Sequence, residues 1–221
     1  MKKITRLGLL LLLLTAFSGS ALRAQEVPTA EVVLPHYTEA TLTPRWADGS
    51  DEDVSNRHRV GSFKLSNQDG QTVCEEDFSG LIRVVSFFFT SCPGICSTMS
   101  TNLGLVQEAF NDDRTVRLVS FSVMPKVDTV SVLHDYAESY AVRSGKWDLL
   151  TGDRKSIYQL ARRSYFAETE MSGSNEDQGI IHSEKLLLVD GAGHIRGVYN
   201  GTLAFDMRRL IEDVRILKRE S

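Results

Sequence analysis

The feature that most constrains the fold is the β-type run Arg83–Phe89 (RVVSFFF). Its apolar residues are consecutive and do not alternate with polar ones, which suits a strand buried on both faces. Thr115–Val123 (TVRLVSFSV) predicts a second strand of the same kind. A sheet that is buried on both faces needs helices above and below it. The two runs therefore predict an α/β sheet that carries helices on both sides.

The rest of the chain predicts further strands and helices in alternation. Met99, Leu103 and Val106 mark one face of a helix over Ser97–Phe110. An Asp69-Gly70 turn between two short runs predicts a hairpin that precedes the buried strand. The hairpin strands are expected at Phe63–Gln68 and Gln71–Glu75, the other helices at Thr129–Val142, Asp153–Tyr165 and Phe205–Lys218, and the other strands at Trp147–Leu150, Lys185–Val189 and His194–Tyr199.

Residues 1–24 have the pattern of a secretory leader. Basic residues come first, an apolar stretch spans residues 7–17, and cleavage is expected after Ala21 or Ala24. The apolar stretch is shorter than the ~20 residues that span a bilayer, and an uncleaved anchor is the alternative. No cysteine lies near the cleavage region, so no lipoprotein anchor is expected. We expect an exported, periplasmic protein that is tethered to the inner membrane only if the leader is retained.

The mature chain is expected to be an acidic protein with one main domain. Without residues 1–24 it keeps 21 basic and 29 acidic side chains, a net charge of −8. An acidic domain without a long basic run is a poor nucleic-acid binder. Three cysteines are too few for a disulfide-stapled scaffold, and their odd number leaves at least one thiol unpaired. The expected organisation is a leader at 1–24, an extended arm at 25–60 and the folded domain at 61–221.

Cys92 and Cys96 stand where the buried strand gives way to the helix, in the segment FFFTSCPGICSTMS. Pro93 suits a first helical turn, and the i, i+4 spacing places both sulfurs on one side of that turn. Helix N-terminal amides lower a thiol pKa and so favour the nucleophilic, metal-binding thiolate. The pair could form a disulfide or bind one soft ion such as Cu(I). A purely structural pair remains an alternative, as does a zinc site that also uses Cys74 and a histidine.

One of the five histidines differs from the others by its position. His182 stands at the start of an apolar strand, after the Gly/Ser/Asn-rich stretch 172–179. Loops that lead into strands often present ligands on a rigid base, although a lone histidine here is more often structural. The other four are expected on the surface or in the arm: His134 and His194 as exposed residues, His36 and His58 in the irregular arm.

At this point several segments together resemble the SCO/SenC family of copper-binding proteins. They are FFFTSCPGICSTM, SFSVMPKVDT, KWDLLTGDRKSIYQLA and IIHSEKLLLVDGAGHIRGVYNGT, and the resemblance covers roughly residues 34–217. It implies a thioredoxin-like fold with an N-terminal β-hairpin extension. It also implies copper ligands at Cys92, Cys96 and His182, with Cys92 and Cys96 as a redox-active pair.

The resemblance implies a metallochaperone that serves the CuA site in subunit II of cytochrome c oxidase. Members of the family deliver copper to that site or keep its cysteines reduced, and a thioredoxin-like thiol reductant would be a further partner. The expected metal is Cu(I), with Cu(II) as a second form. No nucleic-acid partner is expected, and membrane contact is expected only through an uncleaved leader.

The chain departs from the family pattern at two positions near the site. Ser97 replaces the proline that usually follows the second cysteine, and Met124 replaces the aspartate of a D-P-x-x-D-T motif. Pro125, Asp128 and Thr129 of that motif are retained. The Met124 thioether could be an auxiliary soft ligand, although a packing role is the simpler interpretation. Cys74 lies outside the family site and is expected to be a buried free thiol.

Three other functions could use the same cysteines. An extracytoplasmic thiol–disulfide oxidoreductase is the main alternative, although the usual redox motif is C-x-x-C. A peroxidase would need one low-pKa thiolate with a supporting Thr and Arg, and that catalytic context is absent around Thr90. A CuA domain would need a histidine and a methionine at positions that Ser100 and Leu103 occupy here.

Overall fold

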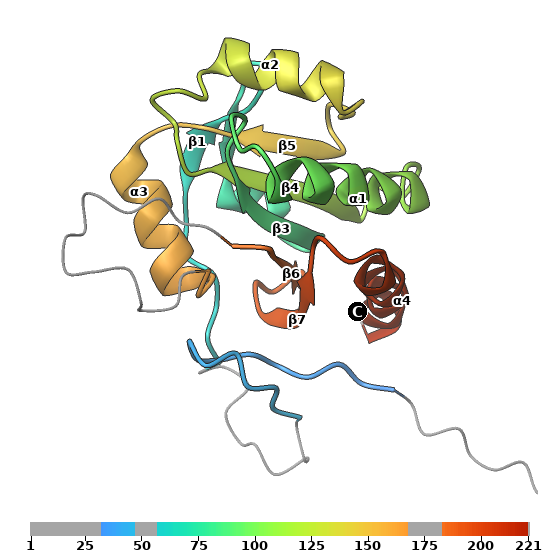
Figure 1. Ribbon diagram of the computed structural model, residues 1–221. Coiled ribbons are helices and arrows are strands. Elements are labelled where there is room, and N and C mark those ends of the chain that lie inside the picture. The colour runs from blue at the N-terminus through green and yellow to red at the C-terminus, as the bar shows by residue number, and fades with distance from the viewer. Residues whose placement is uncertain (1–31, 47–56, 168–182, 221) are drawn as a thin grey trace, which may run out of the picture. The chain divides into compact units, whose positions relative to one another are not determined.

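The computed structural model describes residues 32–46, 57–167 and 183–220, all within one compact unit, Val32–Ser221 (Figure 1). The leader and His182 lie outside the described residues. None of the described helices is long and apolar enough to cross a membrane.

A five-stranded sheet in the order β5-β4-β3-β6-β7 forms the centre of the fold. Its strands β3, β4 and β5 are parallel, while β6 and β7 are antiparallel to their neighbours. A separate antiparallel hairpin, β1–β2, precedes the sheet, as the Asp69-Gly70 turn predicts. The strands are β1 Lys64–Ser66, β2 Thr72–Cys74, β3 Ile82–Phe88, β4 Val116–Ser122, β5 Trp147–Leu150, β6 Lys185–Val189 and β7 Ile195–Asn200.

The sheet has helices on each of its two faces, which confirms the expected α/β class (Figure 1). Phe87 contacts Tyr165 beyond α3, while its neighbour Phe88 contacts Tyr136 of α2 on the opposite face. All seven residues of β3 are buried, as its continuous apolar run predicts. The helices are α1 Ile95–Ala109, α2 Val130–Ser139, α3 Arg154–Gln159 and α4 Ala204–Glu220.

The helix boundaries differ from the sequence prediction, and α2 ends at Ser139, three residues before the expected Val142. The helix expected over Asp153–Tyr165 is regular only to Gln159 and continues as a π-helix, Leu160–Ser164. The Tyr165 amide accordingly donates to the Leu160 carbonyl, five residues back. Helix α1 begins two residues before the predicted Ser97, and its expected core face is buried throughout.

The N-terminal arm is ordered along the edge strand β7 between residues 34 and 45. The Tyr37 amide donates to the Ile195 carbonyl at 3.0 Å, which adds an antiparallel bridge to the sheet. The buried Arg196 guanidinium donates to the Leu34 and Pro35 carbonyls and pairs with Glu220 at 2.6 Å. Periodicity cannot predict this attachment, because the arm joins the sheet through isolated backbone bonds and one arginine.

Candidate functional site

The two cysteines lie on the segment that joins β3 to α1. The strand ends at Phe88 and the helix begins at Ile95, so Cys92 belongs to the connecting loop and Cys96 to the first helical turn. The placement of Pro93 in that turn was wrong: Gly94, with φ −149° and ψ −92°, is the residue that caps α1. Cys92 therefore stands just before the N-terminal amides of α1.

The two thiols are close together but differ in exposure. Both are free; Cys92 is half-buried, while Cys96 is only 4% exposed. The two side chains are close enough for each to shift the pKa of the other. The structure thus combines one thiol that reagents and partners can reach with a second thiol behind it.

The surroundings move the two thiol pKa values in opposite directions. Burial opposes ionisation of Cys92, but hydrogen bonds from Cys96 and from the amides of Gly94, Ile95 and Cys96 outweigh it and lower the Cys92 pKa. Burial first, and then the bond to Cys92, raises the Cys96 pKa to about 12. The helix-terminus argument is therefore confirmed for Cys92 and wrong for Cys96, where desolvation dominates.

A buried carboxylate supports the loop that carries the pair. Asp128 is fully buried and accepts hydrogen bonds from the Ser122 and Thr90 hydroxyls, each at 2.5 Å. The Thr90 amide also faces both carboxylate oxygens at 3.3 Å. The negative charge of Asp128 disfavours a thiolate at Cys96 and contributes to the raised pKa of Cys96. The sequence contains Asp128 and Thr129 just before a helix, but that motif alone does not show which loops the carboxylate joins.

Met124 lies in the same β4–α2 loop, half-buried against the core. Its amide donates to the Ser122 hydroxyl at 3.1 Å, and its carbonyl accepts from the amides of Val127 and Asp128. These backbone bonds fix the loop beside the end of β4. Met124 is therefore held in the same loop as the Asp128 carboxylate.

The third expected ligand, His182, lies outside the described residues, and the chain continues at Ser183. Strand β6 runs antiparallel to β3, with Val85 opposite Leu187, so β6 begins near the end of β3 that leads to the cysteines. The Gly201 amide donates a hydrogen bond to the Glu184 carbonyl. The Gly201 carbonyl in turn accepts a hydrogen bond from the side-chain amide of Asn102 in α1. The residues that follow His182 are thus anchored beside the helix that carries Cys96.

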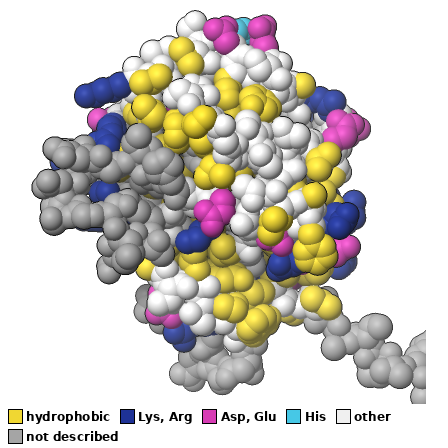
Figure 2. All heavy atoms as spheres, viewed as in Figure 1, with side chains coloured by type: hydrophobic (Ala, Val, Ile, Leu, Met, Phe, Trp, Pro, Cys, Tyr) yellow, Lys and Arg dark blue, Asp and Glu magenta, His cyan; other side chains and the backbone are white. Residues whose placement is uncertain are grey.

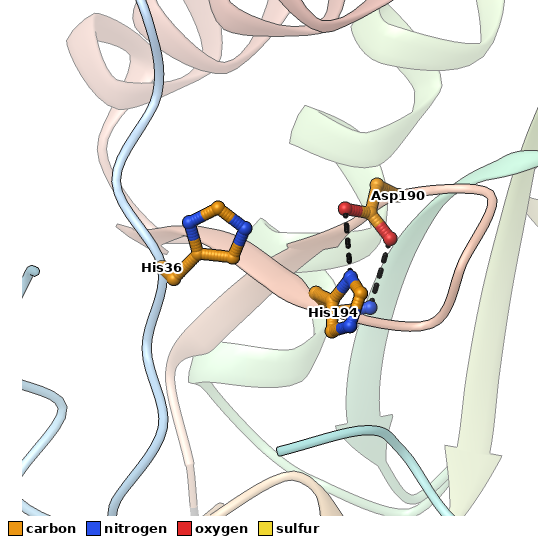
Figure 3. A group of neighbouring side chains, drawn as sticks. All are labelled: His36, Asp190 and His194. Carbon is orange, nitrogen blue, oxygen red and sulfur yellow. Dashed lines mark hydrogen bonds and ion pairs between the residues drawn. The ribbon is translucent and has the colours of Figure 1, made fainter. Parts of the chain in front are cut away.

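The described histidines and Cys74 do not all match their expected environments. His134 is exposed on α2, as expected, but His194 is wrongly predicted as exposed, because only 12% of its side chain is accessible. Cys74 is half-buried in β2, less buried than expected. Within the described ranges, the one group of three metal-ligand side chains joins His36, Asp190 and His194 and contains no cysteine (Figure 3). The zinc alternative around Cys74 gains no support from that grouping.

Charges on the surface are mixed. On the face viewed in Figure 2, acidic and basic side chains are interspersed among apolar patches. Large exposed apolar side chains include Ile95, between the two cysteines, and Leu203 and Phe205 around the start of α4. The first residue of α1 therefore presents an exposed apolar side chain next to Cys96.

Comparisons with known proteins agree with this arrangement. A family model described as SCO1/SenC matches residues 51–218, a range that contains both cysteines and His182. The SCO1 protein homolog of Bacillus subtilis (strain 168) is 32% identical over 160 residues, which make up 72% of this chain and 82% of that protein.

Solved structures extend the similarity to the fold. BsSco, a member of the Sco family of cytochrome c oxidase assembly proteins with an identified disulfide switch, gives a TM-score of 0.63 at 30% identity. That match covers 74% of this chain and 95% of BsSco. Arabidopsis thaliana ScoI with copper bound gives a TM-score of 0.58 at 28% identity and covers 73% of this chain and 98% of that one. The expected thioredoxin-like fold is thereby confirmed.

Proposed function

The chain belongs to the SCO1/SenC family, and from this membership and the thiol geometry we propose that it is a copper metallochaperone for cytochrome c oxidase. Cys92, Cys96 and His182 would bind the ion. The acceptor would be the CuA site of oxidase subunit II, which receives copper or has its cysteines reduced. The leader pattern supports action outside the cytoplasm.

The observation that carries the proposal is the adjacent free thiol pair at the start of α1. Two thiolates and a neutral imidazole form a soft, singly negative site with Cu(I), and such ligands discriminate against hard ions. The lowered pKa of Cys92 makes this thiol the first to give up its proton to the metal. Cys96 would follow only when copper replaces its proton, because burial keeps it protonated otherwise.

The redox state of the pair would control loading. Oxidation of the two thiols to a disulfide releases two protons and two electrons to an acceptor disulfide and removes both sulfur ligands. The same reaction would reduce the cysteines of an acceptor protein, so copper delivery and thiol reduction are two uses of one pair. A thioredoxin-like reductant would restore the free thiols.

Anaerobic Cu(I) titration of the reduced protein tests the ligand set. We expect one copper per chain, with binding strongly weakened in Cys92→Ala, Cys96→Ala and His182→Ala. His134→Ala is the matched control, because His134 is exposed on α2, and its affinity should be unchanged. Equal affinity of His182→Ala and the parent protein would remove His182 from the site.

The oxidase role needs a separate experiment. A deletion strain should lose cytochrome c oxidase activity, and added copper should restore it. Loss of activity that copper does not restore, but a reduced thiol compound does, would favour the reducing role over delivery.

A thiol–disulfide oxidoreductase remains the second candidate because the two thiols differ in acidity. An accessible, acidic Cys92 could attack a substrate disulfide, and Cys96 would then resolve the mixed disulfide. Cys96→Ser should trap that mixed disulfide with exported proteins. Insulin reduction at ordinary enzymatic rates would favour this function over metal delivery.

A further inference from the structure

The tight turn between β6 and β7 holds two metal-ligand side chains in fixed positions. The Asp190 carboxylate accepts from the amides of Ala192 and His194 at 3.0 and 2.8 Å through one oxygen. Its other oxygen lies 3.3 Å from Nδ1 of His194. The Gly193 amide closes the turn onto the Asp190 carbonyl, and its φ of +88° suits glycine. Asp190 and His194 are therefore preorganised by backbone bonds.

The N-terminal arm brings a third such side chain to this turn. His36 makes two backbone hydrogen bonds with Arg45, and its neighbour Tyr37 bonds to Ile195, the residue after His194. The His36 and His194 rings lie 5.7 Å apart in an edge-on arrangement. One ligand atom from each of His36, Asp190 and His194 lies within 4.8 Å of the others, and Figure 3 shows the three side chains gathered at the turn.

We propose that His36, Asp190 and His194, the histidine cluster, form a second metal site for a divalent ion such as Zn²⁺ or Cu²⁺. Two imidazoles and a carboxylate are ligands that these ions accept, at bond lengths of about 2.0–2.2 Å. Ligands of one tetrahedral ion lie roughly 3.4 Å apart, so small rotations of these side chains would close the site. Water would take the remaining position. Cu(I) would prefer the sulfur pair, so the two sites differ in the ion that they select.

The charges around the cluster identify the group that a metal would replace. Arg196 approaches Asp190 at 3.4 Å, but its charge is already matched by Glu220 at 2.6 Å. The Nη1 atom of Arg57 lies 2.9 and 3.1 Å from the two ring nitrogens of His36. Arg57 thus provides a positive charge where the ion would bind, and the ion would exchange with this guanidinium.

The proposed site is independent of the cysteine pair. Asp190 directly follows β6, whose other end lies toward the cysteines. Five residues of strand separate these ends by roughly 16 Å. No side chain can therefore bind metal at both sites at once. If the copper site at the cysteines proves wrong, the proposed site at the histidine cluster is unaffected, and the reverse also holds.

Zinc titration calorimetry on the full chain with Cys92→Ser and Cys96→Ser tests the site without competition from the sulfur pair. We expect one Zn²⁺ per chain, and at least a tenfold loss of affinity when either His36→Ala or His194→Ala is added. Addition of His134→Ala should leave the affinity unchanged. Arg57→Gln should raise the affinity, because it removes the competing cation without touching a ligand.

Cu²⁺ offers a second measurement on the same proteins. Its electron paramagnetic resonance spectrum should show coupling to two nitrogens, reduced to one in His36→Ala. Circular dichroism identifies any variant that is unfolded. If a histidine variant is unfolded, the zinc affinity of Arg57→Gln tests whether the histidine cluster binds the ion. The proposal is overturned if no Zn²⁺ binds, if both histidine variants retain full affinity, or if Arg57→Gln binds no tighter.

Discussion

The thiol pair and the histidine cluster lie at opposite ends of β6, and the two groups are built in different ways. Cys92 and Cys96 come from one short segment, and the amides of that segment already tune the outer thiol. His36 is separated from its two neighbours by most of the chain, and only the arm's attachment to β7 brings them together. A local group can thus be located from its sequence pattern, whereas a group assembled from distant segments cannot.

Within the thiol pair, the largest expected effect is the difference in reactivity between the two cysteines. Because the Cys92 pKa is lowered and that of Cys96 is raised to about 12, Cys92 should react with iodoacetamide at least about a hundredfold faster near neutral pH. Mass spectrometry of the reduced protein at short times measures the ratio. Cys96→Ser is the control that reports Cys92 alone, and comparable labelling of both cysteines would contradict the assigned asymmetry.

Loss of the carboxylate beneath the thiol loop should be the next largest effect. Asp128→Ala leaves the buried Ser122 hydroxyl and the half-buried Thr90 hydroxyl without their acceptor, and we expect a loss of about 2–3 kcal/mol in the free energy of unfolding. Urea denaturation measures it. Asp135→Ala, on the exposed face of α2, should change the stability by less than about 0.5 kcal/mol. Equal stabilities of the two variants would show that the carboxylate does not hold the loop.

The histidine cluster should differ from the thiol loop in its response to acid. Burial first, and then Arg196 and Arg57, lower the His36 pKa from 6.5 to about 4. The unfolded chain therefore binds a proton that the folded chain does not, so stability should fall as pH drops from about 6.5 to about 4 and then level off. After discounting for the half-exposed ring, the loss should be on the order of 1–2 kcal/mol.

Denaturation curves at pH 7 and pH 4.5, in metal-free buffer, measure this contribution. His36→Gln should show a smaller pH difference than the parent protein, because glutamine does not titrate. His134→Gln, an exposed residue on α2, should keep the parent's full difference. A parent-like pH difference in His36→Gln would show that another group is responsible.

The smallest expected effect concerns a surface ion pair outside both groups. Glu108 of α1 contacts Arg143 at 3.0 Å, and both side chains are largely exposed. Such pairs contribute little, so Glu108→Gln should change the free energy of unfolding by only about 0.2–0.5 kcal/mol. Urea denaturation at low and high salt measures it. A change as large as that of Asp128→Ala would mean that surface charge matters as much as the buried thiol support.

Most of the sheet and three of the four helices could be predicted, because buried strands and amphipathic helices leave a regular apolar period. The failures have local causes. The helix after Asp153 changes to a π-helix at Leu160, and a continuous apolar period does not show a wider turn. Pro93 is compatible with a first helical turn, but Gly94 takes the capping position instead. His194 is largely covered because the arm packs beside it, and nothing in the sequence around His194 indicates that.

The cysteine pair, the strand before it and the helix after it could all be located from the sequence, because each depends on neighbours along the chain. The packing of distant segments makes Cys96 the less acidic thiol and allows Asp128 to join two loops. The same packing brings a histidine of the arm to the β6–β7 turn. Burial and through-space charge set these properties, and both depend on which distant segments pack together.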